Sequence, residues 1–316
     1  MLTLSLARER TWHRTSFRVM GSLAELVLDA PASMVPIAVR RLRGLEQSWS
    51  RFDPSSELER LHAHAGEWMP ISADLAVALR WAQRMFAETD GLFDPTVRGP
   101  LEAWGYDRTF REIDAADRVP PELAPTAASA ADEVGVELDR DGRRARIAPG
   151  ARIDLGGIGK GLAADRVAHE LVRDGAVAAY VCLGGDIHAA GEPPAGGWPV
   201  PLLHPSTGAP FATHVLHEGA LVMSTTALRR WRCGDVDVHH LIDPRTGAPA
   251  TTDVVAVAVA CRSAARGEAL AKAALIAGHG EGVALLRRAD VVGWIVGERA
   301  VTTVGADEDD DMRQSA

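Results

Sequence analysis

The chain has 316 residues and is 47% hydrophobic, which is enough to bury the core of one large domain or of two modest ones. Its 43 acidic residues outnumber its 34 basic residues and no basic stripe is visible, so the composition argues against nucleic-acid binding. The three cysteines, Cys182, Cys233 and Cys261, are far apart and lack C-x-x-C spacing. This spacing argues against a disulfide framework or a zinc site and fits a reducing compartment.

The N-terminal segment gives no sign of export. The apolar stretch MLTLSL is soon followed by charged residues, so it is too short for the core of a signal peptide. No run elsewhere reaches the roughly 18 apolar residues that span a bilayer. We therefore expect a soluble, cytoplasmic protein without membrane insertion, in which residues 1–17 are an extension of the folded domain.

The first predicted elements are two amphipathic helices that face the core. Residues 35–49 and 73–89 both carry apolar side chains at helical spacing. The apolar stripe of the second helix consists of Leu75, Leu79, Ala82 and Phe86. Residues 113–133 are rich in Ala, Pro and Asp and have no clear period, so we interpret them as an irregular connection or a surface helix. They are the candidate boundary between two halves.

The second half predicts a sheet with interposed helices. Alternating apolar residues on either side of Asp141-Gly142 indicate a β-hairpin with a tight turn. Further strands are expected within residues 178–191, 198–204, 213–225, 253–262 and 291–298, and helices at 161–174 and 266–277. This order favours an α/β or α+β fold with a mixed, mostly antiparallel sheet. The acidic C-terminal segment, residues 301–316, is typical of a solvated, disordered tail.

A glycine-rich turn, IDLGGIGKGLAAD at residues 153–165, precedes one of these helices. It is not a P-loop, because Asp154 stands where the first glycine belongs and Gly161 where the magnesium-binding hydroxyl belongs. Residues 159–164 match the dinucleotide fingerprint G-x-G-x-x-A, but the preceding strand belongs to a hairpin rather than to a βαβ unit. Free N–H groups at a helix start, together with Lys160, can bind a phosphate. Alternatively, the four glycines only allow a tight crossing of the chain.

Three further segments are dense in glycine, proline, aspartate and aromatic residues. They are residues 88–107, 182–191 and 238–249, and each lies where a strand or helix is expected to end. Loops of this composition typically line binding sites, although each one alone also fits a structural corner. In the third segment we expect His240 to lie beside a substrate. The alternative is that LIDPRTG only makes a stable turn and that His239 faces solvent.

Taken together and in this order, the motifs resemble the FAD:protein FMN transferase (ApbE-like) family from about residue 18 to about residue 297. The resemblance is carried by Met20-Gly21, Ser50-Arg51-Phe52 before SELERL, DGLFDPTV at 90–97, Trp104-Gly105-Tyr106, DLGGIGKGLAAD at 154–165, LGGDI at 183–187 and HLIDPRTGAP at 240–249. It implies an ApbE-like fold, with a mixed sheet and flanking helices, over residues 18–300.

The resemblance implies an enzyme that splits FAD at its pyrophosphate. Such an enzyme transfers the FMN half to a threonine or serine hydroxyl of a target flavoprotein, releases AMP and uses magnesium. We expect the target to be cytoplasmic or membrane-associated. Two alternatives keep the same pocket, namely a pyrophosphatase that converts FAD to FMN and AMP, and a non-catalytic FAD-binding protein. An oxidoreductase rests on the dinucleotide fingerprint alone.

The resemblance also implies roles for individual residues. The positions that correspond to FAD contacts are Met20, Ala103, Trp104, Gly105, Asp154, Lys160 and the backbone near Val255. Among them, Lys160 lies beside the ligand and is a candidate catalytic residue. His240 corresponds to the family's histidine next to the bond that breaks, where an imidazole can act as a base or an orienting group.

Two positions depart from the family pattern. The serine-glycine that precedes the histidine motif is replaced by Ser224-Thr225-Thr226-Ala227. The family's metal ligands are a backbone carbonyl, here that of Gly157, and an Asp and a Thr four residues apart, where this chain has Glu268 and Lys272. Glutamate can bind magnesium, but an ammonium has no lone pair and repels the ion. We therefore expect an altered or absent metal site; the alternative is an ordinary Glu-Lys pair on an exposed helix face.

Overall fold

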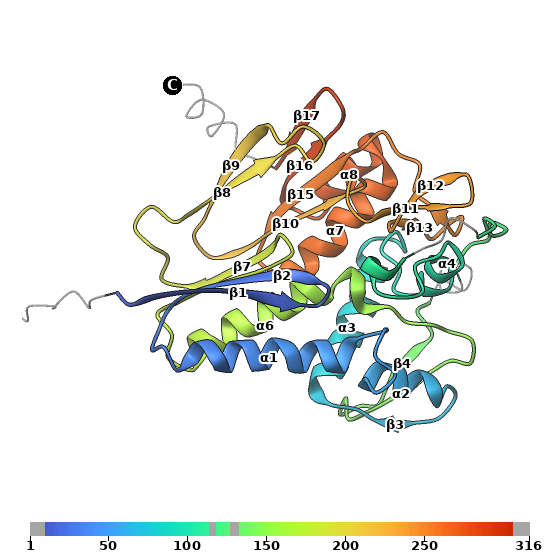
Figure 1. The fold of residues 1–316 in the computed structure, drawn as a ribbon, viewed down its shortest axis with the longest axis horizontal. Helices are drawn as coiled ribbons and strands as arrows, with labels where there is room; N and C mark the ends of the chain where they lie inside the picture. Colours follow the sequence, from blue (N-terminus) through green and yellow to red (C-terminus); the bar gives the residue numbers. More distant parts are fainter. Residues whose placement is uncertain (1–9, 114–117, 127–132, 306–316) are drawn as a thin grey trace, which may run out of the picture.

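An eight-stranded antiparallel sheet forms the centre of the computed structural model, which describes residues 10–113, 118–126 and 133–305 (Figure 1). The strands, in spatial order, are β1 (Trp12–Val19), β2 (Ser22–Asp29), β6 (Ala178–Leu183), β7 (Asp186–Gly191), β10 (Gly219–Thr225), β15 (Ala256–Cys261), β16 (Val292–Val296) and β17 (Val301–Val304). The α/β class is confirmed. The sheet is antiparallel throughout these strands rather than mixed.

Helices cover one face of this sheet in two layers. α6 (Gly159–Arg173) and α7 (Ala264–Ala277) lie directly on the strands, α1 (Met34–Trp49) packs on α6, and α3 (Ala73–Glu88) contacts α1 and α7 (Figure 1). α8 (His279–Arg288) packs beside α7. All four helices expected from the sequence are present, and the whole apolar stripe of α3 is buried. Ser72 and Ser263 cap α3 and α7 by accepting backbone N–H groups.

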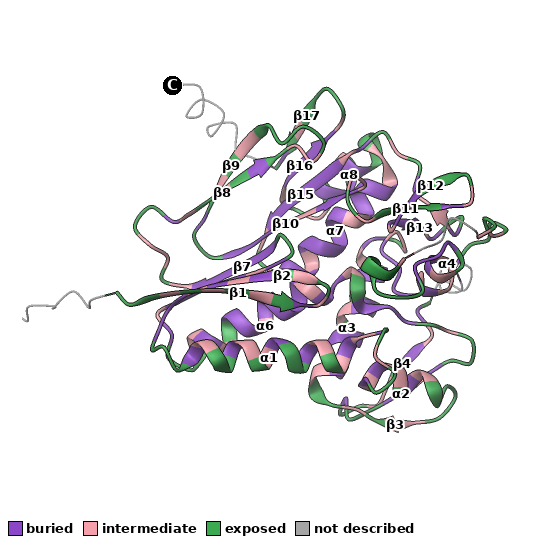
Figure 2. Ribbon diagram, viewed as in Figure 1, coloured by how far each residue is buried: buried purple, intermediate pink, exposed green. Residues whose placement is uncertain are grey.

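The opposite face of the sheet is covered by the hairpin of β8 (Trp198–Leu203) and β9 (Pro210–Leu216). Successive side chains of a strand point to opposite faces, so β10 and β15 contribute side chains to the packed cores on both faces of the sheet. Val222 and Val257 belong to the core beneath the helices, whereas Leu221 and Ala258 pack with the hairpin. Figure 2 shows the buried residues concentrated in these central strands and in α6 and α7.

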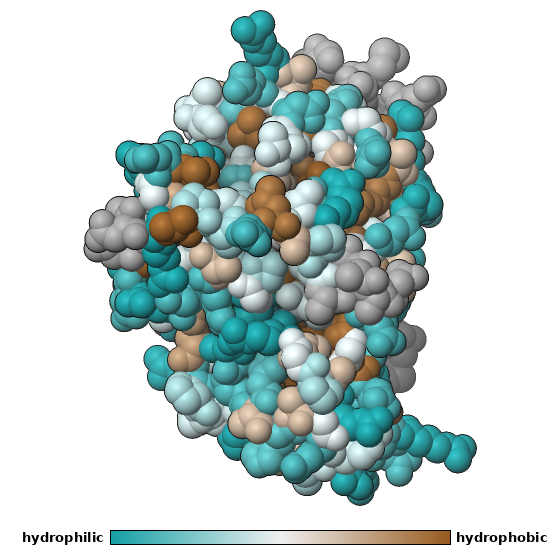
Figure 3. Space-filling view, turned by 90° about the vertical axis from the view of Figure 1, so that its right-hand side faces the viewer, coloured by the Kyte–Doolittle hydropathy of each residue, from teal (hydrophilic) through white to brown (hydrophobic). Residues whose placement is uncertain are grey.

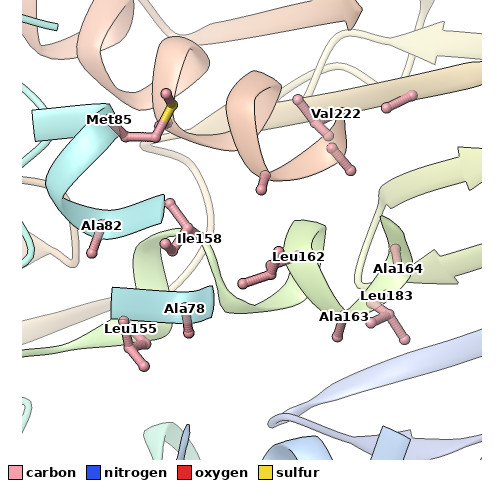
Figure 4. Close-up of a cluster of buried hydrophobic side chains, with 14 of the residues drawn as sticks. Ala78, Ala82, Met85, Leu155, Ile158, Leu162, Ala163, Ala164, Leu183 and Val222 are labelled. Carbon is pink, nitrogen blue, oxygen red and sulfur yellow. The ribbon is translucent and has the colours of Figure 1, made fainter. Parts of the chain in front are cut away.

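The glycine turn is anchored in the main core. Figure 4 shows Leu155 and Ile158 of the turn and Leu162 of α6 near α3 and β10, and all three side chains are at most 2% exposed. Because the residues on both sides of the turn are buried, its position relative to the helices is fixed by packing.

Short elements surround one end of the sheet. They are α2 (Glu57–Ala63), β3 (Met69–Pro70), α4 (Arg98–Ala103), η1 (Phe110–Glu112), β4 (Val136–Leu138), β5 (Arg144–Ile147), η2 (Leu155–Gly157), β11 (Arg230–Cys233), β12 (Val236–His239), β13 (Ile242–Asp243) and β14 (Ala248–Pro249). The predicted hairpin around Asp141-Gly142 is confirmed as β4 and β5, to which β3 adds a third strand.

The expected limits of the folded domain need correction at both ends. Residues 12–17 belong to β1, and residues 301–304 form β17, which pairs with β16. The sequence VTTV is rich in β-branched residues and favours a strand, although the acidic run follows it closely. The rest of the expected tail, residues 306–316, lies outside the described residues.

The candidate boundary at residues 113–133 does not separate two sheets. β2 comes before this segment and β6 after it, yet the two strands pair directly. Residues 114–117 and 127–132 of the segment lie outside the described residues. Over the described ranges, we find no helix that combines the length and the apolar character needed to cross a membrane.

Candidate functional site

A cavity of about 510 Å³ lies among the glycine turn, the C-terminal ends of α1 and α7, and the loops after α3 and β12. This volume is in the range of small-molecule sites. Two aromatic side chains of its lining, Phe52 and Phe110, are 39% and 37% exposed and form part of its rim. Figure 3 views the side of the molecule that carries α4 and β12, where apolar residues form separate patches among hydrophilic ones.

Asp154 holds the glycine turn in place at the cavity wall. Its Oδ1 accepts the N–H of Gly156 at 2.7 Å, and its Oδ2 lies 3.0 Å from Arg51 Nε. The Arg51 guanidinium in turn stacks on the rings of Phe52 and Tyr106, at 4.1 and 4.7 Å from their centres. The carboxylate therefore organises the turn and the arginine, and its predicted contact with FAD stays a prediction.

Gly161 is required by packing rather than by a ligand. A Cβ at this position would lie 2.5 Å from the backbone carbonyl of Ala264, so only glycine lets α6 and α7 approach this closely. The interpretation of the glycines as a tight crossing is therefore correct for Gly161. At Gly159 a Cβ would meet only Trp49, at 3.9 Å, so packing does not explain that glycine.

Four charged side chains meet where α6, α7 and β7 converge. Lys160 Nζ lies 2.5 Å from Asp186 Oδ2 and 2.5 Å from Glu268 Oε1. Lys272 Nζ lies 3.0 Å from the same Oε1 of Glu268. Both lysines line the cavity, and Glu268 is 1% exposed. The idea of an ordinary Glu-Lys pair on an exposed helix face is therefore wrong. We call Lys160, Asp186, Glu268 and Lys272 the lysine cluster.

Burial and mutual attraction compete in setting the charge states of the lysine cluster. Burial alone would lower the pKa of Lys160, but the carboxylates of Asp186 and Glu268 outweigh it and raise that pKa above its ordinary value. Burial opposes ionisation of Glu268, yet the two ammonium groups lower its pKa. For Lys272 burial prevails and lowers the pKa, against the attraction of Glu268.

His240 lines the cavity directly after β12, and its buried Nδ1 lacks a hydrogen-bond partner among the described residues. Burial and the nearby charges of Arg229 and Lys272 hold its pKa well below the ordinary value for histidine. The imidazole is therefore neutral near pH 7 and can accept a proton. This geometry agrees with the residue that the sequence singled out.

His239 has a different environment from its neighbour. It is 7% exposed, its Nε2 donates to the carbonyl of Ala250 at 3.1 Å, and its Nδ1 accepts the N–H of Leu241 at 3.3 Å. The alternative in which His239 faces solvent is therefore wrong in that respect, although residues 243–247 do form a bonded turn. Both ring nitrogens of this histidine serve the fold.

Several predicted ligand contacts do not reach the cavity. Trp104 is 5% exposed in a cluster with Leu101 and Tyr106, and its Nε1 donates to the carbonyl of Gly247 at 2.8 Å. Its neighbours Ala103, which is exposed, and Gly105, which is buried, are not part of the lining either. A large indole that has found a hydrogen-bond partner packs as core, so Tyr106 reaches the cavity instead.

Val255 is also outside the cavity lining. Its N–H donates to the carbonyl of Val296, and its own carbonyl accepts the hydroxyl of Thr225 at 2.9 Å. The altered Ser224-Thr225-Thr226-Ala227 segment thus forms a hydrogen bond to the backbone of Val255 within the fold. Met20, in contrast, lines the cavity and has a φ of 52°.

The structure adds cavity residues that the sequence pattern did not reveal. Trp49 ends the buried stripe of α1, but its Nε1 faces no acceptor in the part of the chain that the structure describes. Arg229 lines the cavity from the loop before β11 and has a φ of 51°. From sequence alone, a tryptophan that lines a cavity cannot be told from one that only packs in the core of a helix. An arginine with a left-handed backbone conformation also gives no sequence signal.

The predicted metal ligands Gly157 and Glu268 both lie at the cavity, but Glu268 is engaged by protein groups. Gly157 lines the cavity, but both oxygens of Glu268 are engaged, Oε1 by the two lysines and Oε2 by the N–H of Gly161 at 2.9 Å. Within the described ranges, no three or more His, Cys, Asp or Glu side chains are grouped so as to hold a metal ion. The two ammonium groups beside Glu268 have no lone pair to offer a divalent cation and repel it.

Sequence comparison connects this site to known proteins. The model of the ApbE family matches residues 20–295. The FAD:protein FMN transferase of Rhodobacter capsulatus is 30% identical over 274 residues, which cover 84% of this chain and 51% of that protein. The one of Treponema pallidum is 30% identical over 309 residues, covering 89% and 83%. The chain thus spans about half the length of the first relative and most of the second.

Structural comparison shows the same fold in two solved proteins. The ApbE protein of Thermotoga maritima has a TM-score of 0.81 at 24% identity, and the match covers 96% of this chain and 99% of that one. The flavin transferase ApbE from Vibrio cholerae has a TM-score of 0.74 at 21% identity, with coverage of 94% and 98%. At these identities the likeness concerns the fold alone.

Proposed function

The chain belongs to the ApbE family, and we propose on this basis that its cavity binds FAD and transfers the FMN half to a threonine or serine hydroxyl of a target protein. The hydroxyl oxygen forms a bond to the FMN phosphorus while the bond from that phosphorus to the bridging oxygen breaks. The bridging oxygen leaves with AMP, and the hydroxyl proton passes to a base. The enzyme is therefore a flavin transferase.

The observation that carries this proposal is the position of His240 in one cavity with Lys160 and Lys272. Transfer of a phosphoryl group needs a base for the incoming hydroxyl and positive charge for the phosphate oxygens. His240 has a neutral ring with an unpartnered buried nitrogen, and the lysines supply the charge. The two requirements of the reaction are thus met by neighbouring walls of the cavity.

The remaining lining suits the flavin ring. Trp49, Phe52 and Tyr106 give the cavity an aromatic wall. Trp49 Nε1 and Arg51 Nη1 are buried donors without a hydrogen-bond partner in the described chain, and Nη1 lies 3.8 Å from Glu102, beyond hydrogen-bond distance. The carbonyl oxygens and ring nitrogens of a flavin are acceptors. We assign these two donors to the flavin because buried polar groups are normally satisfied.

A mass measurement tests the proposal. The purified protein is incubated with FAD and a candidate acceptor flavoprotein, with the acceptor threonine or serine changed to valine or alanine as the control. We expect the acceptor to gain the mass of one FMN less one water, and AMP to appear in equal amount. Free FMN and AMP without an adduct would favour the pyrophosphatase, and unchanged bound FAD would favour a non-catalytic binder.

We also propose that the target is a cytoplasmic protein or the cytoplasmic side of a membrane protein. The three thiols, Cys182, Cys233 and Cys261, are all free, as suits a reducing compartment. Cell fractionation with an antibody against the chain tests this location. Recovery of the chain with exported proteins would contradict it.

A further inference from the structure

Both lysines of this chain lie in the lysine cluster. Of the 34 basic Lys and Arg residues, only Lys160 and Lys272 are lysines, and every other one is arginine. The two come from different helices, α6 and α7, and meet at the same Oε1 atom of Glu268, at 2.5 and 3.0 Å. A lysine ammonium is a compact point charge with three donors, unlike the planar arginine fork. The cluster is thus the one place where the sequence uses this type of cation.

Both oxygens of Glu268 accept hydrogen bonds from protein donors. Its Oε1 accepts from both ammonium groups, and its Oε2 accepts the N–H of Gly161 at 2.9 Å. The carboxylate is 1% exposed and lies at the α6-α7 crossing that Gly161 makes possible. This carboxylate therefore serves to hold the two lysines together rather than to bind an external cation.

Each lysine keeps an N–H group for a ligand. Lys160 uses two of its three donors, on Asp186 and Glu268. Lys272 uses one on Glu268 Oε1 and makes a longer contact of 3.5 Å to the carbonyl of Glu268. Both side chains line the cavity and keep 15% and 14% of their surface exposed. An anion in the cavity can therefore reach both ammonium groups.

We propose that Lys160 and Lys272, fixed by Glu268 and Asp186, neutralise the diphosphate of FAD in place of a divalent metal ion. The proposal rests on the proposed function for the identity of the ligand. Each ammonium group keeps an N–H for a phosphate oxygen, and such charge-assisted hydrogen bonds are the strong kind. A divalent ion placed here would face two cations that are hydrogen-bonded to Glu268, the predicted carboxylate ligand.

FAD binding without an acceptor protein tests this inference independently of transfer. Kd is measured by flavin fluorescence, in EDTA and across a magnesium titration, for the wild type, Lys272→Thr, Lys272→Arg and Glu268→Asp/Lys272→Thr. We expect the wild type to bind FAD equally well in EDTA and in magnesium. Lys272→Thr loses about tenfold or more in EDTA, because a charged hydrogen bond is removed. Lys272→Arg recovers part of the affinity.

A direct metal measurement and a matched control complete the test. Mn²⁺ binding, followed by its EPR signal, should be absent in the wild type and appear in the double variant, whose FAD affinity then depends on metal. Arg173→Thr removes one positive charge from the exposed end of α6 and should leave Kd unchanged. In protein labelled with ¹⁵N-lysine, FAD should shift both Nζ signals.

Results that contradict this inference can be told apart from results that contradict the proposed function. A wild type that binds FAD only with magnesium, or that binds Mn²⁺ stoichiometrically, would overturn this inference and leave the transferase intact. FAD binding that is unaffected by Lys272→Thr would also overturn it. A protein that binds FAD under none of these conditions would overturn both this inference and the proposed function.

Discussion

The two walls of the cavity satisfy their polar groups in opposite ways. In the lysine cluster each charged side chain already has a protein partner of opposite charge. On the aromatic wall, Trp49 Nε1 and Arg51 Nη1 are buried without a hydrogen-bond partner among the described residues, although Arg51 Nε pairs with Asp154. His240 Nδ1, in the same cavity, also lacks a partner there. An unmade hydrogen bond of a buried group costs about 1 to 3 kcal/mol. The paired carboxylates thus support the fold and fix the lysines, whereas the unpartnered groups indicate where the ligand supplies the missing partner.

The largest effect is expected at His240, which belongs to the unpaired set. His240→Ala should lower the transfer rate by about 10²- to 10⁴-fold, the usual contribution of a general base, and leave the Kd for FAD nearly unchanged. The rate is followed by the mass of the acceptor, and Kd by flavin fluorescence. His239→Ala is the matched control and should lower the melting temperature instead, because both its ring nitrogens are bonded within the fold.

Glu268, which holds the two lysines of the cluster, should affect mainly stability when it is mutated. Glu268→Ala leaves two buried ammonium groups beside each other, and breaking a buried ion pair costs about 3 to 5 kcal/mol of the free energy of unfolding. Urea unfolding measures the loss. Glu137→Ala, which removes the exposed pair with Arg146, should cost about 1 kcal/mol or less. Equal losses in the two variants would refute the distinction between the walls.

The pH dependence should reflect the depressed pKa of His240. Burial lowers this pKa well below the ordinary value of 6.5, so the ring is deprotonated and competent at neutral pH. As pH falls, kcat/KM should therefore hold through pH 6.5 and decline only below it. The measurement is the pH profile of kcat/KM, which reports groups of the free enzyme. A decline that is already complete at pH 6.5 would assign the base to another group.

The smallest effect is expected from a single missing donor. Trp49→Phe keeps an aromatic ring but removes the unpaired N–H, so FAD should bind about 2- to 12-fold more weakly, the value of one neutral hydrogen bond. The melting temperature of the free protein should fall only through lost packing, because Trp49 is 5% exposed in the core but its N–H makes no bond within the described fold. Trp198→Phe, on the β8-β9 hairpin, is the control and should leave Kd unaffected.

The sequence predicted the parts of the fold that depend on local periodicity. α1, α3, α6 and α7 were predictable because their apolar residues recur at helical spacing. β1 was not, because WHRTSFRV is mostly polar and its place depends on pairing with β2 at the edge of the sheet. β17 was concealed by the acidic run that follows it.

The site residues that belong to recognisable sequence motifs could be predicted. His240, Lys160 and Met20 could be placed from motifs, and the structure brings all three to one cavity. The partnership of Asp186 with Lys160 could not be derived, because it depends on how β7 packs on α6. Trp104 was assigned to the ligand because motif and core tryptophans look alike in sequence. Its ring is 5% exposed and bonded to Gly247, so its contact with FAD stays a prediction.

The pairing of β2 with β6 has a consequence for synthesis on the ribosome. Asp29 pairs with Ala178, so β2 lacks its neighbour until the ribosome has translated most of the intervening chain. At typical translation rates this delay is on the order of 10 s. During that time the β2 edge of the β1-β2 hairpin is also open and can pair with another nascent chain. We therefore expect fragments that end before residue 178 to aggregate, and slow translation to make the yield of native protein depend on chaperones.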